Sequence, residues 1–265
     1  MSKRILVCYL FTDFDKLNNL KNFIVNYKKY PSGVNHKLLI CFKLIDKRKI
    51  FKLKKYLTKI NHILYDDICK INDYDFGSYK RVAISYPNYK ILFLNSHSYP
   101  ICKFWLKKLL FHFKKKTLIG TTASNESMYS SIKLKKIYKF FSFSLRKRWF
   151  KEKFYPFPNP HIRTSSFLIN SSDFLSFVKN RNFNTKEDAW FAESGKNGMT
   201  NFFKKKKFNI LIVNSDGLKF EEKNWIKSNT YHNLNQSKLI ISDKHTRKYF
   251  KQGMSDKLKN FLVWG

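Results

Sequence analysis

The sequence contains few of the residues that define fibrous, disulfide-rich or low-complexity proteins. Its 265 residues include only 8 glycines and 6 prolines, which excludes a collagenous chain. Hydrophobic residues make up 43%, enough for a large core, so wholesale disorder is not expected. The four cysteines, Cys8, Cys41, Cys69 and Cys102, are far apart and show neither CxxC nor zinc-binding spacing. We therefore expect buried free thiols in a reducing compartment.

Long apolar runs are also missing. No stretch approaches the about 18–20 apolar residues that cross a bilayer. The apolar run at 5–11 is too short for the core of a signal peptide and is better explained as a first strand. The expected location is cytoplasmic, with peripheral attachment at the inner face of the plasma membrane as a further expectation.

Acidic residues are scarce, with 18 Asp and Glu against 53 Lys and Arg, giving a net charge of +35. Such a charge predicts an anionic partner. The cations comprise 45 lysines and only 8 arginines, although arginine is favoured for forked phosphate and base contacts. A nucleic-acid partner is therefore disfavoured, and an anionic membrane surface is preferred.

Continuous apolar strands alternate with amphipathic helices along the first part of the chain. Expected strands lie at 4–11, 37–43, 63–65 and 91–94, with helices at 15–30, 47–57 and 76–85. Further strands are expected at 118–119, 161–170, 208–213 and 239–241, and further helices at 104–113 and 186–193. This alternation predicts one α/β domain over 1–265, with a mostly parallel sheet covered by helices on both faces.

Polar residues gather where these strands end, which is where ligands bind in such sheets. Asn95 and His97 follow the strand at 91–94. Asp75 precedes Gly77, where the backbone can approach a nucleotide closely, although Asp75 is equally well explained as a helix N-cap. His161 and Arg163 alternate along an expected strand, so both would face one side and could bind a diphosphate.

Several short motifs resemble those of a known bacterial family. They are FLNS at 93–96, GTTASNESMYS at 120–130, PNPHIRTSSF at 158–167, KEDA at 186–189, ESG at 193–195 and SDKHTRKY at 242–249. Together with GVNH at 33–36 and DFGSY at 75–79, they resemble putative bacterial glycosyltransferases with a GT-A-like fold, near the family 2 and rhamnan-synthesis enzymes. The resemblance covers nearly the whole chain.

The resemblance implies a nucleotide-sugar donor and a carboxylate that takes the proton of the acceptor hydroxyl. Family 2 enzymes use the Asp of a Glu-Asp pair, which Glu187 and Asp188 resemble, and Glu193 is a second candidate. An acidic pair at this position is also explained by the helix dipole alone.

The position of the Asp-x-Asp that holds Mn²⁺ or Mg²⁺ in GT-A enzymes reads Asn95-Ser96-His97 in this sequence. Asn and neutral imidazole are poor ligands for such hard cations. The sequence thus leaves the Mn or Mg requirement open, with Lys and Arg as the alternative partners of the diphosphate.

A basic and aromatic excursion at 133–154 suits anionic headgroups. It is equally explained as an ordinary helical excursion with solvated lysines, and a single-stranded nucleic acid is a third alternative.

The favoured hypothesis is an inverting transferase that moves a sugar from a nucleotide-sugar donor to a cell-surface glycan or a lipid-linked acceptor. A non-catalytic relative that binds nucleotides or glycans is the alternative, because the Asp-x-Asp is missing. A basic nucleic-acid-binding protein is the third, and least favoured, hypothesis.

Overall fold

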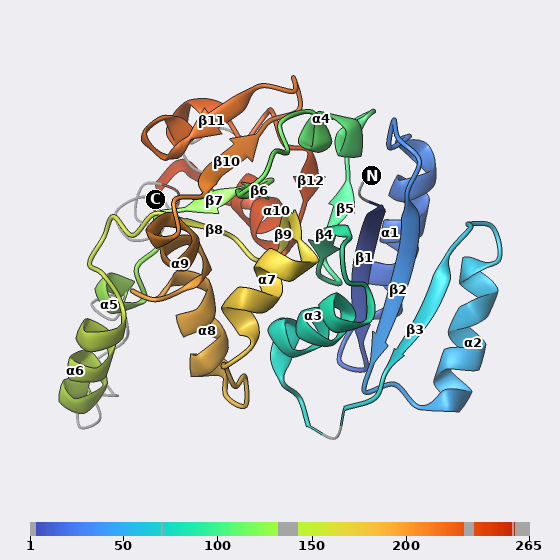
Figure 1. Ribbon diagram of the computed structural model, residues 1–265, viewed down its shortest axis with the longest axis horizontal. Helices are drawn as coiled ribbons and strands as arrows, with labels where there is room; N and C mark the ends of the chain where they lie inside the picture. The colour runs from blue at the N-terminus through green and yellow to red at the C-terminus, as the bar shows by residue number, and fades with distance from the viewer. Residues whose placement is uncertain (1–3, 70, 132–142, 231–235, 256, 258–265) are drawn as a thin grey trace.

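An eight-stranded sheet runs through the computed structural model, which describes residues 4–69, 71–131, 143–230, 236–255 and 257. The strand order is β11-β10-β6-β9-β4-β1-β2-β3 (Figure 1). The strands are β1 (Ile5–Thr12), β2 (Lys37–Lys43), β3 (Ile63–Asp67), β4 (Lys90–Leu94), β6 (Thr117–Gly120), β9 (Ser166–Asn170), β10 (Asn209–Val213) and β11 (Lys219–Glu221).

Most neighbouring strands are parallel. β1 pairs in parallel with β2 and β4, β2 with β3, and β6 with β10. β9 is antiparallel to both of its neighbours, β4 and β6, and β11 is antiparallel to β10. The start of β9 therefore lies at the edge where β1, β4 and β6 end, since Ser166 is opposite Leu94.

The continuous apolar strands are buried on both faces, as the sequence pattern predicts. In β1, Leu6, Cys8 and Leu10 face one core, whereas Val7, Tyr9 and Phe11 face the other. Successive side chains point to opposite sides of a strand, so an unbroken apolar run is what a sheet between two layers requires.

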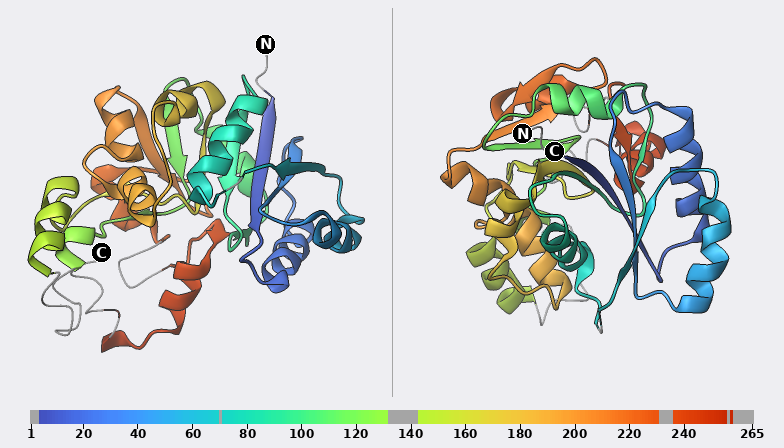
Figure 2. Two further views of the ribbon diagram at one scale, coloured as in Figure 1. Left: turned by 90° about the horizontal axis from the view of Figure 1, so that it is seen from below. Right: turned by 45° about the vertical axis from the view of Figure 1, so that its right-hand side comes forward.

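Helices cover both faces of the sheet (Figure 2). One core includes side chains of α3 (Tyr74–Ser85), α7 (Ser171–Val178), α8 (Lys186–Ser194) and α9 (Met199–Lys205). The other includes α1 (Leu17–Lys29), α2 (Lys47–Leu57) and α4 (Trp105–Phe111). The predicted α/β class, with a mostly parallel sheet and helices on both faces, is confirmed.

The prediction of one strand over 161–170 is wrong. Residues His161–Ile162 form β8, which pairs with β7 (Ala123–Ser124) in a small separate sheet. β9 begins only at Ser166, in the large sheet. Between them, the backbone N–H of Thr164 donates to the side chain of Glu193 and is therefore not available to a strand ladder.

The remaining elements lie near the ends of the large sheet or beside it. β5 (Tyr99–Pro100) pairs with β12 (Ile241–Ser242), which leads into α10 (Lys244–Lys251). The 3₁₀ helix η3 (Glu222–Ser228) follows β11. The helices α5 (Met128–Ser131) and α6 (Phe143–Lys153) pack against each other.

The basic and aromatic excursion falls partly outside the described residues, since 132–142 are not among them. In its described part, Phe150 and Phe154 are buried and pack with aromatic side chains of α5, α6 and α8. These two rings therefore stabilise the excursion. Over the described ranges, no helix combines the length and apolar character needed to cross a bilayer.

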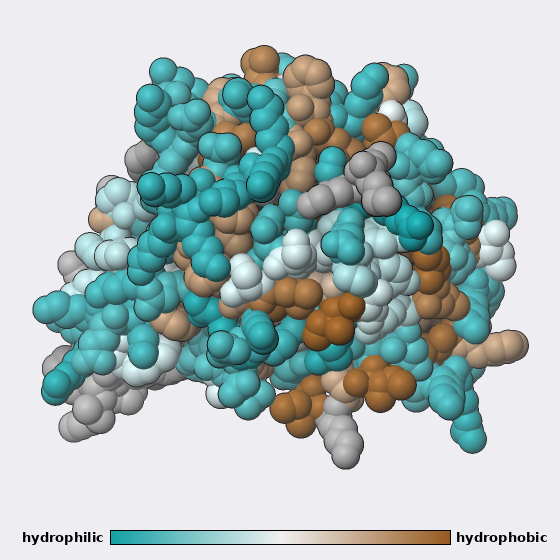
Figure 3. All heavy atoms as spheres, viewed as in Figure 1, coloured by the Kyte–Doolittle hydropathy of each residue, from teal (hydrophilic) through white to brown (hydrophobic). Residues whose placement is uncertain are grey.

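The surface is predominantly hydrophilic on the face shown in Figure 3, where apolar side chains occur in small separate groups. The two edges of the large sheet are short strands that carry charges. β3 ends in Asp66 and Asp67, and β11 reads Lys-Phe-Glu.

An aromatic cluster lies between the centre of the sheet and helices α3 and α7. The ring of Phe93 is 4.5 Å from that of Tyr79, 5.2 Å from Phe167 and 5.0 Å from Phe174, measured between centroids. All four side chains are fully buried. Such contacts add to the free energy of area burial.

Replacing Phe93 by Ala should lower the free energy of unfolding by about 3–5 kcal/mol, because the ring leaves a cavity among three aromatic neighbours. Phe51→Ala is the matched control, since the side chain of Phe51 is 78% exposed; it should change the value by no more than about 0.5 kcal/mol. Urea unfolding followed by circular dichroism measures both, and equal effects would contradict the assigned core.

Candidate functional site

The candidate site lies at the carboxyl edge of the parallel strands. Asn95 follows β4, and its backbone N–H donates to the carbonyl of Ser165, 3.1 Å away, just before β9 begins. The hydroxyl oxygen of Ser98 lies 3.0 Å from the same carbonyl oxygen and 2.8 Å from Oδ1 of Asn95, so its one proton is shared between the two acceptors. The loop after β4 is thereby joined to the segment that enters β9.

The side chain of Asn95 shapes this loop. Its Oδ1 accepts from the backbone N–H of His97 at 3.2 Å and from the hydroxyl of Ser98 at 2.8 Å. The Nδ1 of His97 lies 3.1 Å from the side-chain amide nitrogen of Asn19. Since that nitrogen only donates, Nδ1 accepts and the ring proton resides on Nε2. Burial lowers the pKa of His97, against the opposing effect of Asp15.

Asp15 is a member of the site that sequence reasoning missed. Its Oδ2 accepts from the backbone N–H and the hydroxyl of Thr12, both at 2.8 Å, and its Oδ1 accepts from Ser96 at 2.6 Å. The carboxylate therefore joins the loop after β1 to the loop after β4. The available signal was an Asp three residues beyond a buried strand, a pattern shared by many ordinary turns.

The residues at the Asp-x-Asp position do not fit a hard divalent cation. The Asn95 oxygen already accepts two hydrogen bonds, and the free lone pair of His97 already accepts one. Within the described ranges, no group of three or more His, Cys, Asp or Glu side chains is placed to hold a metal ion.

A buried lysine lies at the end of β2. Lys43 is 1% exposed, and its Nζ is 2.6 Å from Oδ1 of Asp73 and donates to the carbonyl of Tyr74. Arg81 binds the same carboxylate and that of Asp67. Burial works against ionisation of Asp73, but the hydrogen bonds from Arg81 and Lys43 outweigh it, so the pKa of Asp73 is lowered.

The small size of Gly77 serves this ion-pair network. A Cβ on Gly77 would lie only 1.9 Å from Oδ2 of Asp73. The close approach predicted for a nucleotide at this glycine is thus made by a protein carboxylate in this structure.

The carboxylates of Asp75 and Glu126 both lie close enough to Glu193 to be affected by its charge. Burial raises the pKa of Asp75 to about 6, with Asp15 and Glu193 adding to the shift and Lys43 opposing it. Burial and repulsion from Glu193 raise the pKa of Glu126 to about 7, against the effect of Arg163. Neither Asp75 nor Glu126 has a hydrogen-bond partner for its carboxylate among the described residues, and both keep partial contact with solvent. Such groups are available to a ligand.

Glu193 is held in a defined orientation on α8. Its Oε1 accepts from both the backbone N–H and the hydroxyl of Thr164, each at 2.8 Å. Its Oε2 has no hydrogen-bond partner in the part of the chain that the structure describes. Buried Asn159 joins the segment of Glu126 to the end of α8, which carries Glu193. Its side-chain amide donates to the backbone carbonyls of Glu126 and Ser194, at 3.2 and 2.7 Å.

His161 and Arg163 are both buried beside this group. The Nδ1 of His161 donates to the carbonyl of Asn159 at 2.7 Å, and burial lowers the pKa of the ring, so a neutral Nε2 remains as an acceptor. Arg163 forms a two-pronged ion pair with Asp243, at 2.8 and 3.2 Å. The charge of Arg163 is thus largely offset within the protein.

Asp243 also caps α10, accepting from the backbone N–H groups of His245 and Thr246. Arg247 of the same helix donates to the carbonyl of His97 at 3.0 Å, and its guanidinium lies 4.8 Å from the centroid of the Tyr99 ring. A partly exposed cation therefore lies beside the loop after β4.

Asp188 lies apart from these residues. Its carboxylate accepts from the backbone N–H of Thr185 at 2.9 Å, while Thr185 caps the N–H of Asp188. Five residues of helix, about 7.5 Å along the axis, separate it from Glu193. The structure therefore brings together Asp75, Glu193 and His161. Arg163 connects this group, through Asp243 and Ser165, to the loop that carries Asn95 and His97. Asp188 belongs to a capping box instead.

No family model matches the chain, and no curated protein matches its sequence. Solved structures with some likeness include the bifunctional glycosyltransferase WbbM, 11% identical over 72% of this chain and 37% of WbbM, with a TM-score of 0.41. HddC from Yersinia pseudotuberculosis is 10% identical over 76% of this chain and 97% of its own, with a TM-score of 0.42.

Core-mannan synthase A from Aspergillus fumigatus, in an Mn/GDP form, is 10% identical over 71% of this chain and 63% of its own, with a TM-score of 0.38. The chain thus spans little more than a third of WbbM. At TM-scores below 0.5, this likeness does not define an activity.

The raised pKa of Glu126 makes a testable contribution to stability. The pKa of Glu126 is raised from 4.5 in the unfolded chain to about 7 in the folded protein. Its contribution to the free energy of unfolding is therefore fully present below about pH 4.5, and it is lost as the pH rises through about 7. Relative to the parent, Glu126→Gln should therefore become more stable by about 3 kcal/mol between pH 4.5 and pH 8. Urea unfolding at both pH values measures this difference.

Glu221→Gln, at an exposed position of β11, is the control and should follow the parent at both pH values. A Glu126→Gln curve parallel to the parent would contradict the burial of the Glu126 carboxyl and its repulsion from Glu193.

Proposed function

We propose that the protein is a glycosyltransferase with a GT-A-like fold, moving a sugar from a nucleotide-sugar donor to a glycan or lipid-linked acceptor with inversion. One observation carries the proposal. The Glu193 carboxylate is anchored through one oxygen and open at the other, beside the unpartnered carboxylates of Asp75 and Glu126, at the carboxyl edge of the parallel strands. Ligands bind at this edge in open α/β sheets.

Glu193 is the proposed general base. A base must be oriented and must keep an oxygen for the proton it accepts, and Glu193 meets both conditions. Asp188 is the second candidate, and its capping role does not remove its second oxygen. A proton on Glu126 would relieve its electrostatic repulsion of Glu193. Glu126 would then be the protonated carboxyl group of the two, and Glu193 the one that accepts the proton of the acceptor hydroxyl.

The reaction is a single displacement. Glu193 takes the proton of the acceptor hydroxyl, whose oxygen attacks the anomeric carbon of the sugar. The bond from that carbon to the diphosphate oxygen breaks, and the electron pair leaves with the nucleoside diphosphate. Asp75 and the neutral Nε2 of His161 would accept hydrogen bonds from sugar hydroxyls.

The departing diphosphate needs about two negative charges offset. Arg247 and Lys244 are the proposed partners, since both lie on the helix beside His97 and Lys244 is exposed. Gly77, Asn95 and Arg163 would shape the nucleotide side through the contacts described above. The residues at 95–97 do not fit Mn²⁺ or Mg²⁺, so no step is assigned to a metal.

A lipid-linked acceptor would place the protein at the inner face of the plasma membrane, as a cytoplasmic, peripherally attached enzyme. The charge of +35 supports this partner. So do the exposed Lys147, Arg148 and Lys151 of α6. Each basic residue near an anionic surface contributes about 1 kcal/mol.

Nucleotide binding can be tested by thermal shift with UDP, GDP and their glucose, N-acetylglucosamine and mannose derivatives. At saturating concentration, at least one nucleotide should raise Tm by several degrees through mass action. The shift should be the same in 2 mM Mn²⁺ and in EDTA, and smaller in Arg247→Ala. A shift that requires Mn²⁺ would refute the proposed role of Arg247 and Lys244.

With the donor so identified, Glu193→Gln should reduce transfer to water or acceptor by about 10²- to 10⁴-fold, because the base is lost, while the nucleotide Kd changes by less than about twofold. Titration calorimetry and donor hydrolysis measure the two quantities. The control Asp188→Asn should keep its activity and lose about 1 kcal/mol of stability.

Loss of transfer in Asp188→Asn but not in Glu193→Gln would reverse the assignment. Donor binding without hydrolysis or transfer in the parent would instead identify a non-catalytic relative.

A further inference from the structure

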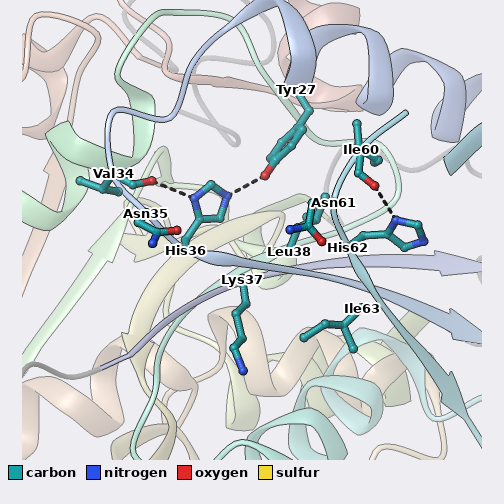
Figure 4. A pocket seen from close by; sticks show the side chains of 10 residues that line it. All are labelled: Tyr27, Val34, Asn35, His36, Lys37, Leu38, Ile60, Asn61, His62 and Ile63. Carbon is teal, nitrogen blue, oxygen red and sulfur yellow. Dashed lines mark hydrogen bonds between the residues drawn. The ribbon is translucent and has the colours of Figure 1, made fainter. Parts of the chain in front are cut away.

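A pocket lies at the amino ends of the strands, on the side of the sheet opposite to the candidate site, where β2 and β3 begin (Figure 4). Its volume is about 520 Å³, within the usual range for small-molecule sites. The lining comes from α1, from the segment that enters β2 and from the segment that enters β3. None of these residues belongs to the candidate active site.

The hydrogen bonds of the two histidines fix which ring nitrogens carry protons. His36 has Nδ1 3.0 Å from the carbonyl of Val34 and Nε2 2.8 Å from the hydroxyl of Tyr27. A carbonyl only accepts, so Nδ1 of His36 is protonated and Nε2 accepts from Tyr27. By the same reasoning, Nδ1 of His62 donates to the carbonyl of Ile60 at 2.8 Å, and its Nε2 remains an acceptor.

Three polar groups in the pocket remain available to a ligand. Nε2 of His62 and the side-chain amides of Asn35 and Asn61 have no hydrogen-bond partner in the described ranges. Asn35 and Asn61 are exposed and come from different segments, and Figure 4 shows Asn61 between the two imidazoles. Each amide offers both a donor and an acceptor.

The pocket presents little charge. Among the described residues that line it there is no carboxylate, and the one charged side chain among them, Lys37, has its Nζ 5.9 Å from the centroid of the Tyr89 ring. Figure 4 shows Lys37 pointing away from the two imidazoles. The pocket therefore lacks the cation that a phosphate or carboxylate ligand would need.

We infer that this pocket binds a neutral carbohydrate, through the amides of Asn35 and Asn61 and the free imidazole nitrogen of His62. Sugar hydroxyls both donate and accept, which matches two amides and one bare nitrogen. The C–H surfaces of the sugar would contact Val34, which also lines the pocket and is partly exposed. With both asparagines exposed, the bound sugar stays partly hydrated, and the expected Kd is about millimolar.

The inference goes beyond the proposed transferase activity and does not require it. The pocket lies at the amino ends of the strands, and the candidate active site lies at their carboxyl ends. A sugar bound there would be an already assembled glycan segment, held away from the reacting end.

The test is a chemical-shift titration of the ¹⁵N-labelled full-length protein with maltose, lactose and N,N′-diacetylchitobiose up to 20 mM. At least one disaccharide should shift the Asn61 and His62 signals with a millimolar Kd. Asn61→Leu and Asn35→Leu should each weaken binding at least fivefold. The control Asn180→Leu, at an exposed position outside the pocket, and Glu193→Gln should bind as the parent does.

The inference is overturned if none of the three sugars binds, or if acetate or inorganic phosphate shifts the same signals at lower concentration. It is also overturned if Glu193→Gln abolishes sugar binding and Asn61→Leu does not. That last result would place the sugar at the proposed active site and leave the proposed transferase function standing. Circular dichroism melting of each variant verifies that it is folded.

Discussion

The ion pair between Arg163 and Asp243 holds the candidate site together. It joins the segment between β8 and β9 to the first residue before α10, two regions eighty residues apart in sequence. Asp243 also accepts from Ser165, whose carbonyl binds Asn95 and Ser98. A single buried pair thus fixes the loop after β4, the start of β9 and the cap of α10. Because both partners are buried, loss of either would leave an uncompensated charge, which is far more destabilising than loss of a surface pair.

This arrangement also explains the break between β8 and β9. The backbone N–H of Thr164 donates to Glu193, so it is not available to a strand ladder at this point. The break turns Thr164 toward α8, where its N–H and hydroxyl orient Glu193. The irregular backbone is therefore the means by which the sheet edge positions a carboxylate.

Acidic groups are rare in this chain, yet Asp75 and Glu126 both lie near Glu193 at positions where burial raises their pKa. Elsewhere in the described structure, acidic side chains such as Asp67 and Asp73 are bound by Arg81 or Lys43. Asp75 and Glu126 are not bound in this way. Groups that are costly to fold and available to solvent are typical of sites where stability is exchanged for function.

The strands and helices were predictable because their signals are local. The unbroken apolar runs of β1, β2 and β4 identified a sheet buried on both faces, and the helices of the first half followed within a few residues of their predicted bounds. The strand at 161–170 was wrong because the partners of Arg163 and Thr164 lie far away in sequence.

The candidate site was less predictable for the same reason. Asp75, Glu193 and His161 were identified, but Asp15, Lys43 and Glu126 were missed. The local signals of these three are weak, since their significance comes from the neighbours that the fold gives them. Lys43 offered the clearest signal, as a lysine at the end of an otherwise apolar strand.

The charged, short edge strands of the sheet bear on how the protein behaves at high concentration. β3 and β11 expose unpaired backbone groups, which are templates for a strand from another molecule. The exposed Asp66 near the end of β3 and the Lys and Glu that flank Phe220 in β11 disfavour such addition, because an added strand would have to bury their charges. The sheet can therefore carry a very apolar interior without offering an edge from which intermolecular aggregation would propagate.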